Sequence, residues 1–178
     1  TKLLRIQEER LESYLAALKA GNVPKRAPGV PGFGVVELML PLLCHPSSKY
    51  YRNPELIGPM EDEVNHTLSA QHPSGCVSLV NCNIDSPPDT GFHVPVAALL
   101  YKVGRRYPVP EAEGVLQGLL TFMERAKPCL LTGGIHTPNH RWVMSGALAN
   151  LYELFGDEAF KERAFQFLDE QFDITEYG

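Results

Sequence analysis

Apolar residues recur at helical spacing along most of the chain. Between residues 2 and 20 four leucines are separated by intervals of seven, four and three, which puts them on one side of an α-helix. These are Leu4, Leu11, Leu15 and Leu18. The same kind of spacing recurs in residues 53–72, 90–106, 110–131, 140–155 and 158–172. Together with a short apolar segment at 35–45, it predicts about seven helices.

Proline, glycine and short polar residues indicate where these helices begin and end. Asn53 is a helix cap followed by Pro54, and Gly21 and Gly156 end their helices. The segment 23–34 holds three prolines and three glycines and is a loop. Residues 73–89 break the helical period, so we expect an irregular or briefly extended crossing there. The short loops between helices predict an all-α fold of antiparallel helical hairpins.

Charge and composition narrow the functional classes. The 178 residues carry a formal net charge of −5 with a pI near 5.7, which argues against general nucleic-acid binding. The apolar runs are shorter than the roughly 18 residues of a membrane span. None of the four cysteines forms a CxxC pair. A Cys76–Cys82 disulfide is one option for an exported protein. Buried free thiols are favoured, because Cys44 and Cys129 lie in apolar segments.

The densest group of chemically active side chains stands at residues 136–142, "HTPNHRW". Pro138 disfavours helix at the residue before it, so we expect the helix to start with Asn139 as its N-cap. His140 and Arg141 then lie in the first turn, where free N–H groups and the helix dipole favour an anion. Arginine holds a carboxylate with two hydrogen bonds, imidazoles exchange protons near neutral pH, and Trp142 offers a face for stacking.

A second group lies in "NCNIDSPPDTGFHV", residues 81–94. Asp85, Asp89 and His93 are four residues apart, but the Pro87–Pro88 pair prevents one helix from carrying all three. We expect an extended Pro-Pro segment and a helix capped by Asp89 or Thr90. Proline also interrupts the HxxxH spacing of the two histidines in the first group. We therefore predict neither a metal site nor a cofactor.

With "DSPPDTGF" and "TPNHRWVMSGALA" in view, the chain resembles the heparinase II/III-like polysaccharide lyases, which are built on an (α/α)6 toroid. The resemblance implies that Asn139 binds a uronate carboxylate, that His140 is a base or charge stabiliser, and that Arg141 clamps the acid group. The tyrosine that these lyases use has no motif-supported match here. The candidates without a motif are Tyr101, Tyr107, Tyr152 and Tyr177.

The candidate residues fall into two sets. The catalytic candidates are His140, Asn139, His136 and Asp89. The substrate-binding candidates are Arg141, Trp142, His93 and Asp85. Three functions stay open: β-elimination of a uronate glycan, hydrolysis of a glycan by Asp85 and Asp89, and a non-catalytic carbohydrate-binding or assembly module.

We expect residues 1–178 to form a single helical domain. Twelve helices with their loops need well over 200 residues, so the domain would be part of a toroid. A homodimer or a missing C-terminal segment would then cover its apolar faces. The expected ligand is a polysaccharide or oligosaccharide, and the sequence does not indicate the compartment.

Overall fold

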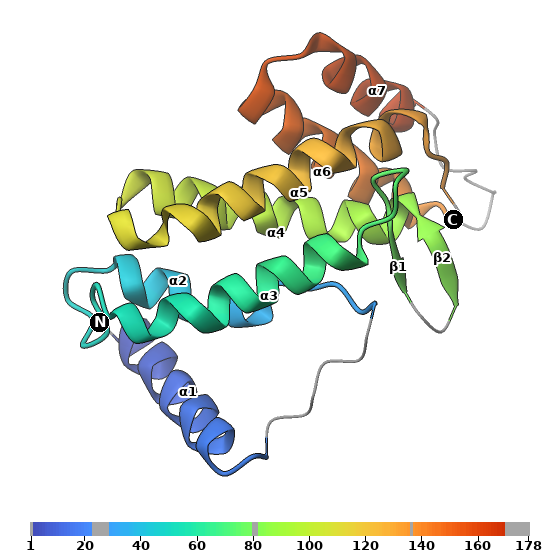
Figure 1. The fold of residues 1–178 in the computed structure, drawn as a ribbon. Coiled ribbons are helices and arrows are strands. Elements are labelled where there is room, and N and C mark those ends of the chain that lie inside the picture. The colour runs from blue at the N-terminus through green and yellow to red at the C-terminus, as the bar shows by residue number, and fades with distance from the viewer. Residues whose placement is uncertain (1, 23–28, 80–81, 136, 170–178) are drawn as a thin grey trace, which may run out of the picture.

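The structure, a computed structural model, describes residues 2–22, 29–79, 82–135 and 137–169 (Figure 1). Seven α-helices account for most of these residues, so the all-α prediction is confirmed. They are α1 (Lys2–Lys19), α2 (Gly34–Cys44), α3 (Ile57–Ala70), α4 (Pro87–Arg106), α5 (Glu113–Thr132), α6 (Asn139–Phe155) and α7 (Glu158–Asp169). Short 3-10 turns, Pro54–Leu56 and Pro110–Ala112, precede α3 and α5. Strands β1 (Val77–Leu79) and β2 (Asn83–Ser86) pair as an antiparallel hairpin.

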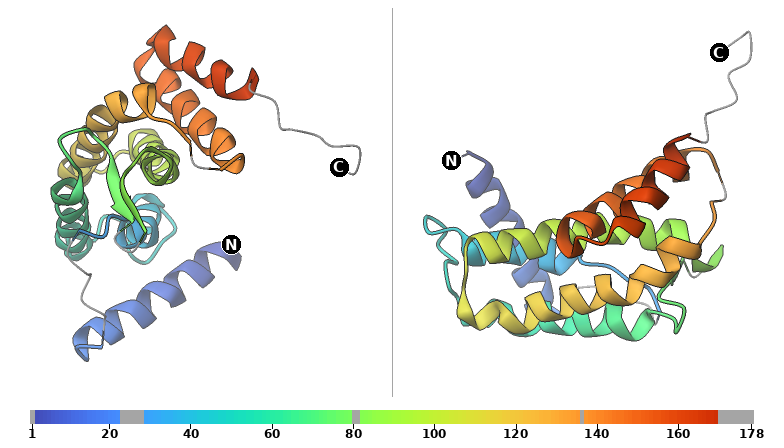
Figure 2. Two further views of the ribbon diagram at one scale, coloured as in Figure 1. Left: turned by 90° about the vertical axis from the view of Figure 1, so that its right-hand side faces the viewer. Right: turned by 90° about the horizontal axis from the view of Figure 1, so that it is seen from above.

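The helices alternate between two layers. Helix α4 packs on both α2 and α6, whereas α5 packs on α3 and, less extensively, on α7. Seen from the end in Figure 2 (left), α3 and α5 lie side by side, with α2 and α4 beside them and the hairpin in front. Consecutive helices pair as well, most extensively α4 with α5 and α6 with α7. The result is an arc of antiparallel hairpins, as the short loops predicted.

Within the α2–α4–α6 layer the helices run in the same direction. Phe92 near the start of α4 contacts His140 at the start of α6, with ring centroids 6.2 Å apart. Further along both helices, Lys102 Nζ lies 2.6 Å from Glu153 Oε2. Phe33, which precedes α2, contacts His93 of α4 at 6.4 Å. The N-terminal ends of these three helices therefore meet at one end of the layer.

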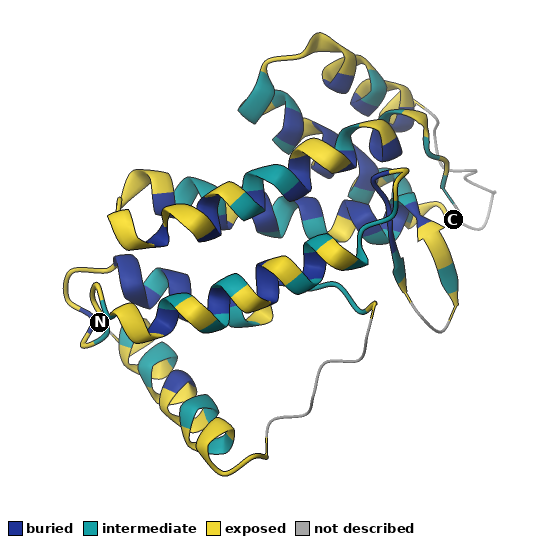
Figure 3. Cartoon of the chain, in the orientation of Figure 1, coloured by how far each residue is buried: buried dark blue, intermediate teal, exposed yellow. Residues whose placement is uncertain are grey.

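The core lies between the two layers (Figure 3). In α5 the predicted inward residues Val115, Leu119, Phe122 and Ala126 are all fully buried. Helix α1 is different: only Leu11 is buried. Of the described helices, α1 packs chiefly on α2, so only a narrow part of its apolar side is buried.

A buried carboxylate fixes the start of α2. Glu63 of α3 is 5% exposed, and its Oε2 accepts hydrogen bonds from the backbone N–H groups of Val35 (2.7 Å) and Val36 (2.8 Å). The first N–H groups of a helix lack partners within the helix and carry partial positive charge. Glu63 therefore replaces the side-chain cap that α2 lacks and neutralises its N-terminal end.

Candidate functional site

The N-cap and the first residues of α4 differ from those that the sequence predicted. Ser86 is the N-cap, and its Oγ accepts a hydrogen bond from the Asp89 N–H at 3.3 Å. Pro87 and Pro88 are the first two helical residues, where the missing N–H groups cost nothing. The predicted extended Pro-Pro segment and the cap at Asp89 or Thr90 are therefore wrong. The prolines initiate the helix.

The hairpin holds the Asp89 side chain in position. Asn83 of β2 donates from Nδ2 to Asp89 Oδ2 at 2.9 Å. Asn83 was not among the predicted site residues. Its side-chain contact is to the first turn of the following helix. Tertiary packing decides that contact.

His93 lies one turn further along α4 and is half-buried. Its Nδ1 is 2.7 Å from the backbone carbonyl oxygen of Asp89. A carbonyl only accepts, so Nδ1 carries the hydrogen and Nε2 of the neutral ring holds a lone pair. The ring also meets Phe33 at 68°. His93 is thus fixed in the tautomer that accepts a proton at Nε2.

The start of α6 also corrects an expectation. Asn139 is the first helical residue, and Pro138 occupies the cap position with helical φ −54° and ψ −39°. The N–H groups of His140 and Arg141 donate to the carbonyls of Thr137 and Pro138 at 3.0 and 3.1 Å. The turn therefore begins before the helix. Asn139 is exposed and accepts a hydrogen bond from the Thr137 hydroxyl.

The two predicted groups meet at the common end of the layer. The Phe92 and His140 rings lie edge to face, at an angle of 85°. Gly91 packs against Val143 so closely that an added Cβ would lie 3.1 Å from Val143 Cγ1. Residues some fifty positions apart in sequence therefore share one surface region. Phe92 was missed as a site residue because a lone phenylalanine in a helix ordinarily indicates core.

Arg141 and Trp142 follow on the first turn of α6. Arg141 is half-buried, and Trp142 is 60% exposed. The first turn of α6 contains no acidic residue. In contrast, Glu63 neutralises the start of α2, and Asp89 lies in the first turn of α4. The first turn of α6 thus differs from that of α4 in carrying a basic side chain and no acidic one.

Asp85 points to the turn before the hairpin. It lies in β2 with a left-handed φ of 52°. Its Oδ1 accepts a hydrogen bond from the Ser74 hydroxyl, and its N–H donates to Ser78 Oγ at 2.9 Å. The Asp89 carboxylate is held instead by Asn83. The two acids that a glycoside hydrolase would use, Asp85 and Asp89, thus have separate hydrogen-bond partners, and Asp85 stabilises the hairpin.

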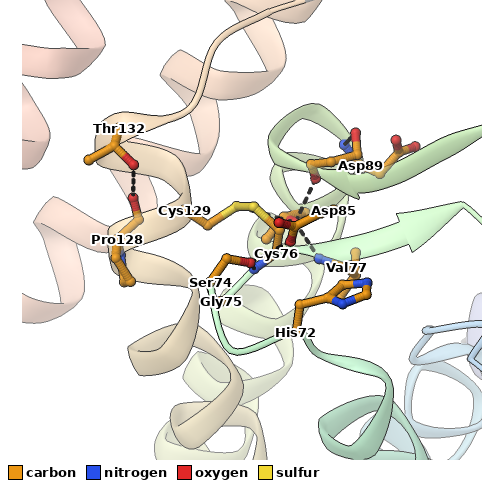
Figure 4. Close-up of a disulfide and its surroundings, with 12 residues drawn as sticks. His72, Ser74, Gly75, Cys76, Val77, Asp85, Asp89, Pro128, Cys129 and Thr132 are labelled. Atoms are coloured by element: carbon orange, nitrogen blue, oxygen red, sulfur yellow. Dashed lines mark hydrogen bonds between the residues drawn. A yellow bond between two sulfur atoms is a disulfide. The ribbon is translucent and has the colours of Figure 1, made fainter.

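The cysteine prediction is wrong for three of the four residues. Cys76 and Cys129 form a disulfide with Cα atoms 5.3 Å apart, and both residues are nearly fully buried (Figure 4). Cys82 is an exposed free thiol, and only Cys44 is a buried free thiol as expected. Burial raises the pKa of Cys44 to about 11. The 53-residue separation brings no local motif, so the pairing depends on the close approach of the segment before β1 to α5, where Gly75 lies against the Arg125 backbone.

The disulfide lies directly behind the start of α4. Cys129 Sγ is 3.6 Å from Thr90 Oγ1, which accepts a hydrogen bond from the Val77 N–H and donates to the Ser86 carbonyl. Figure 4 shows the bond between α5 and the segment entering β1, with Asp85 and Asp89 nearby. The covalent link thus anchors the hairpin whose Asn83 holds Asp89.

The remaining predicted residues fall outside this region. His136 lies outside the described residues, as does Phe172, an expected inward residue of the last helix. His45 and His72 contact Ser47 and Ser78, which are near them in sequence, and His66 contacts the backbone carbonyl oxygen of Val30 in the loop before α2. Across the described ranges, no three histidine, cysteine or acidic side chains are arranged to bind a metal ion.

The helices of the described chain include none that is both long and apolar enough to cross a membrane. No protein-family model matches the sequence, and neither a curated protein nor a solved structure is significantly similar to it. The function must therefore be argued from the site itself.

Proposed function

We propose that the protein is a polysaccharide lyase that cleaves a uronate-containing glycan by β-elimination at the common end of α2, α4 and α6. The observation that carries this proposal is the meeting of the starts of α4 and α6 through the Phe92–His140 contact. It brings imidazoles from two helices to one end of the layer, next to a helix start whose first turn carries Arg141 and no acidic residue.

Each side chain has a role that its chemistry suits. Asn139 and Arg141 bind the uronate carboxylate, whose charge increases when the proton on the adjacent carbon is removed. Preorganised donors at such a position contribute about 3 kcal/mol or more to transition-state stabilisation. His140 removes the proton. His93, held by Asp89 in the tautomer with an accepting Nε2, is a second proton acceptor.

The reaction balances without a cofactor. The C5–H bond breaks and the proton passes to the base. The electron pair forms the C4–C5 double bond, the C4–O bond breaks, and the leaving oxygen takes up a proton from water. Trp142 supplies an exposed face for a sugar ring. The net charge of −5 does not oppose an acidic substrate when the cationic groups are concentrated locally.

The test is incubation of the purified protein with heparan sulfate, hyaluronan, alginate and pectate. The expected result is ultraviolet absorbance from the unsaturated product. New reducing ends without that absorbance would mean hydrolysis, and binding without any product would mean a non-catalytic module.

His140→Ala is expected to lower kcat about 100- to 10,000-fold, the usual contribution of a positioned base. His45→Ala is the matched control, because His45 is exposed and follows the opposite end of α2. Turnover by His140→Ala equal to that of the wild type would refute the catalytic assignment.

A further inference from the structure

We propose that Phe92 forms a stacking subsite for the apolar face of a pyranose ring bound beside His140. This inference rests on the proposed function, because it assigns the sugar ring to Phe92 and the uronate carboxylate to the start of α6. It adds a substrate-binding residue that the sequence motifs do not indicate.

The placement of Phe92 supports this role. The side chain is 52% exposed, although it lies on a helix whose neighbouring residues Gly91 and Val94 are buried. Its ring stands at 85° to the His140 ring, with centroids 6.2 Å apart. A sugar ring packed on the exposed phenyl ring would therefore lie next to the His140 imidazole.

The exposed apolar side of α4 continues away from the site. Leu99 is 62% exposed and lies seven residues further along, about 10 Å down the helix axis. If exposure on this side of α4 were enough for sugar binding, Phe92 and Leu99 would contribute equally. Phe92 differs because it is aromatic and because it contacts His140. Leu99 is therefore the matched control.

A uronate has a charged edge and an apolar face, which suit Arg141 and Phe92 respectively. The negative charge lies on the carboxylate at the edge of the ring, where Asn139 and Arg141 provide donors. One face of a pyranose carries mainly C–H groups, which pack on an aromatic ring. A phenyl group forms this contact in the substrate and in the transition state alike. Its loss should therefore raise KM and leave kcat unchanged.

The experiment compares Phe92→Leu, Phe92→Tyr and Leu99→Ala with the wild type on the glycan that gives unsaturated product. Phe92→Leu keeps apolar volume without the ring, and Phe92→Tyr restores the ring. We expect KM to rise about five- to tenfold in Phe92→Leu, as loss of an aromatic contact implies. Phe92→Tyr and Leu99→Ala should stay within about twofold of the wild type, with thermal unfolding used to check that each variant is folded.

The outcomes separate this inference from the proposed function. An unchanged KM in Phe92→Leu, or an equal rise in Leu99→Ala, would overturn the subsite while lyase activity stands. If the wild type binds a glycan of the panel without cleaving it, dissociation constants replace KM, and weaker binding by Phe92→Leu alone supports the subsite although the lyase proposal fails. If the wild type neither binds nor cleaves any of the four glycans, both proposals are overturned.

Discussion

Removing the Cys76–Cys129 disulfide should destabilise the protein by about 4 kcal/mol. The bond joins residues 53 positions apart. For a loop of that length, chain-entropy arguments give a loss of about 14 cal/mol/K in the unfolded state, or about 4 kcal/mol at 25 °C. Domains of this size are typically stable by about 5–15 kcal/mol. The disulfide therefore accounts for a large share of the stability.

The measurement is urea unfolding of the double variant Cys76→Ala/Cys129→Ala, followed by circular dichroism and by fluorescence of Trp142, the single tryptophan. The wild type measured with a reductant should approach the variant. Cys82→Ser is the control, since that thiol is exposed and free. The m-value should also increase, because an unfolded chain without the cross-link exposes more surface.

Two results would refute this reasoning. One is a double variant whose free energy of unfolding lies within about 1 kcal/mol of the wild type, which is well below the loop-closure term. The other is mass spectrometry of the unreduced protein showing four alkylated cysteines after denaturation. The second result would mean that the pairing itself is wrong.

Four further predictions concern the core and the thiols. Glu63→Ala should lower the free energy of unfolding by about 3 kcal/mol, because two N–H groups at the start of α2 lose a charged acceptor. Urea unfolding measures this change. Asp62→Ala is the control, because Asp62 is exposed, and it should change stability by less than about 0.5 kcal/mol. Gly75→Ala should lower the free energy of unfolding by about 2 kcal/mol or more in the same assay, because φ is +89° and the new Cβ would lie 1.9 Å from a backbone oxygen of α5. A variant as stable as the wild type would contradict this close approach. Iodoacetamide at pH 8 should modify Cys82 and spare Cys44, whose pKa burial raises from about 9 to about 11, as peptide mapping would establish. Since the folded pKa of Cys44 is the higher one, its contribution to stability should be lost as pH rises from about 9 through 11.

Local sequence signals predicted the helices well. The apolar spacing in α5 identified Val115 and Phe122 as core. Asn53 caps as expected, with its Oδ1 accepting from the Glu55 N–H at 3.0 Å. Gly156 ends α6 in the left-handed conformation, with φ 69°. These features depend on residues within one or two turns of each other, so spacing and capping rules suffice to predict them.

Predictions that depended on contacts between distant residues were less successful. The Cys76–Cys129 pair requires the segment before β1 to fold back on α5, and the Asn83–Asp89 hydrogen bond, although it joins residues six apart, depends on how β2 leads into α4. The cap at Asn139 was misassigned because Pro138 can itself adopt helical angles. A proline restricts the backbone angles of the residue before it, but its own angles are compatible with the first turn of a helix.

The common direction of α2, α4 and α6 makes the architecture extensible. A two-helix unit added after α7 in the same manner would contribute another first turn to the same rim without reversing any existing helix. First-turn side chains would thus accumulate around the rim one hairpin at a time, and the opposite rim would consist of loops and helix C-termini. Designed variants would therefore lengthen this rim by whole hairpins while each hairpin keeps its own packing.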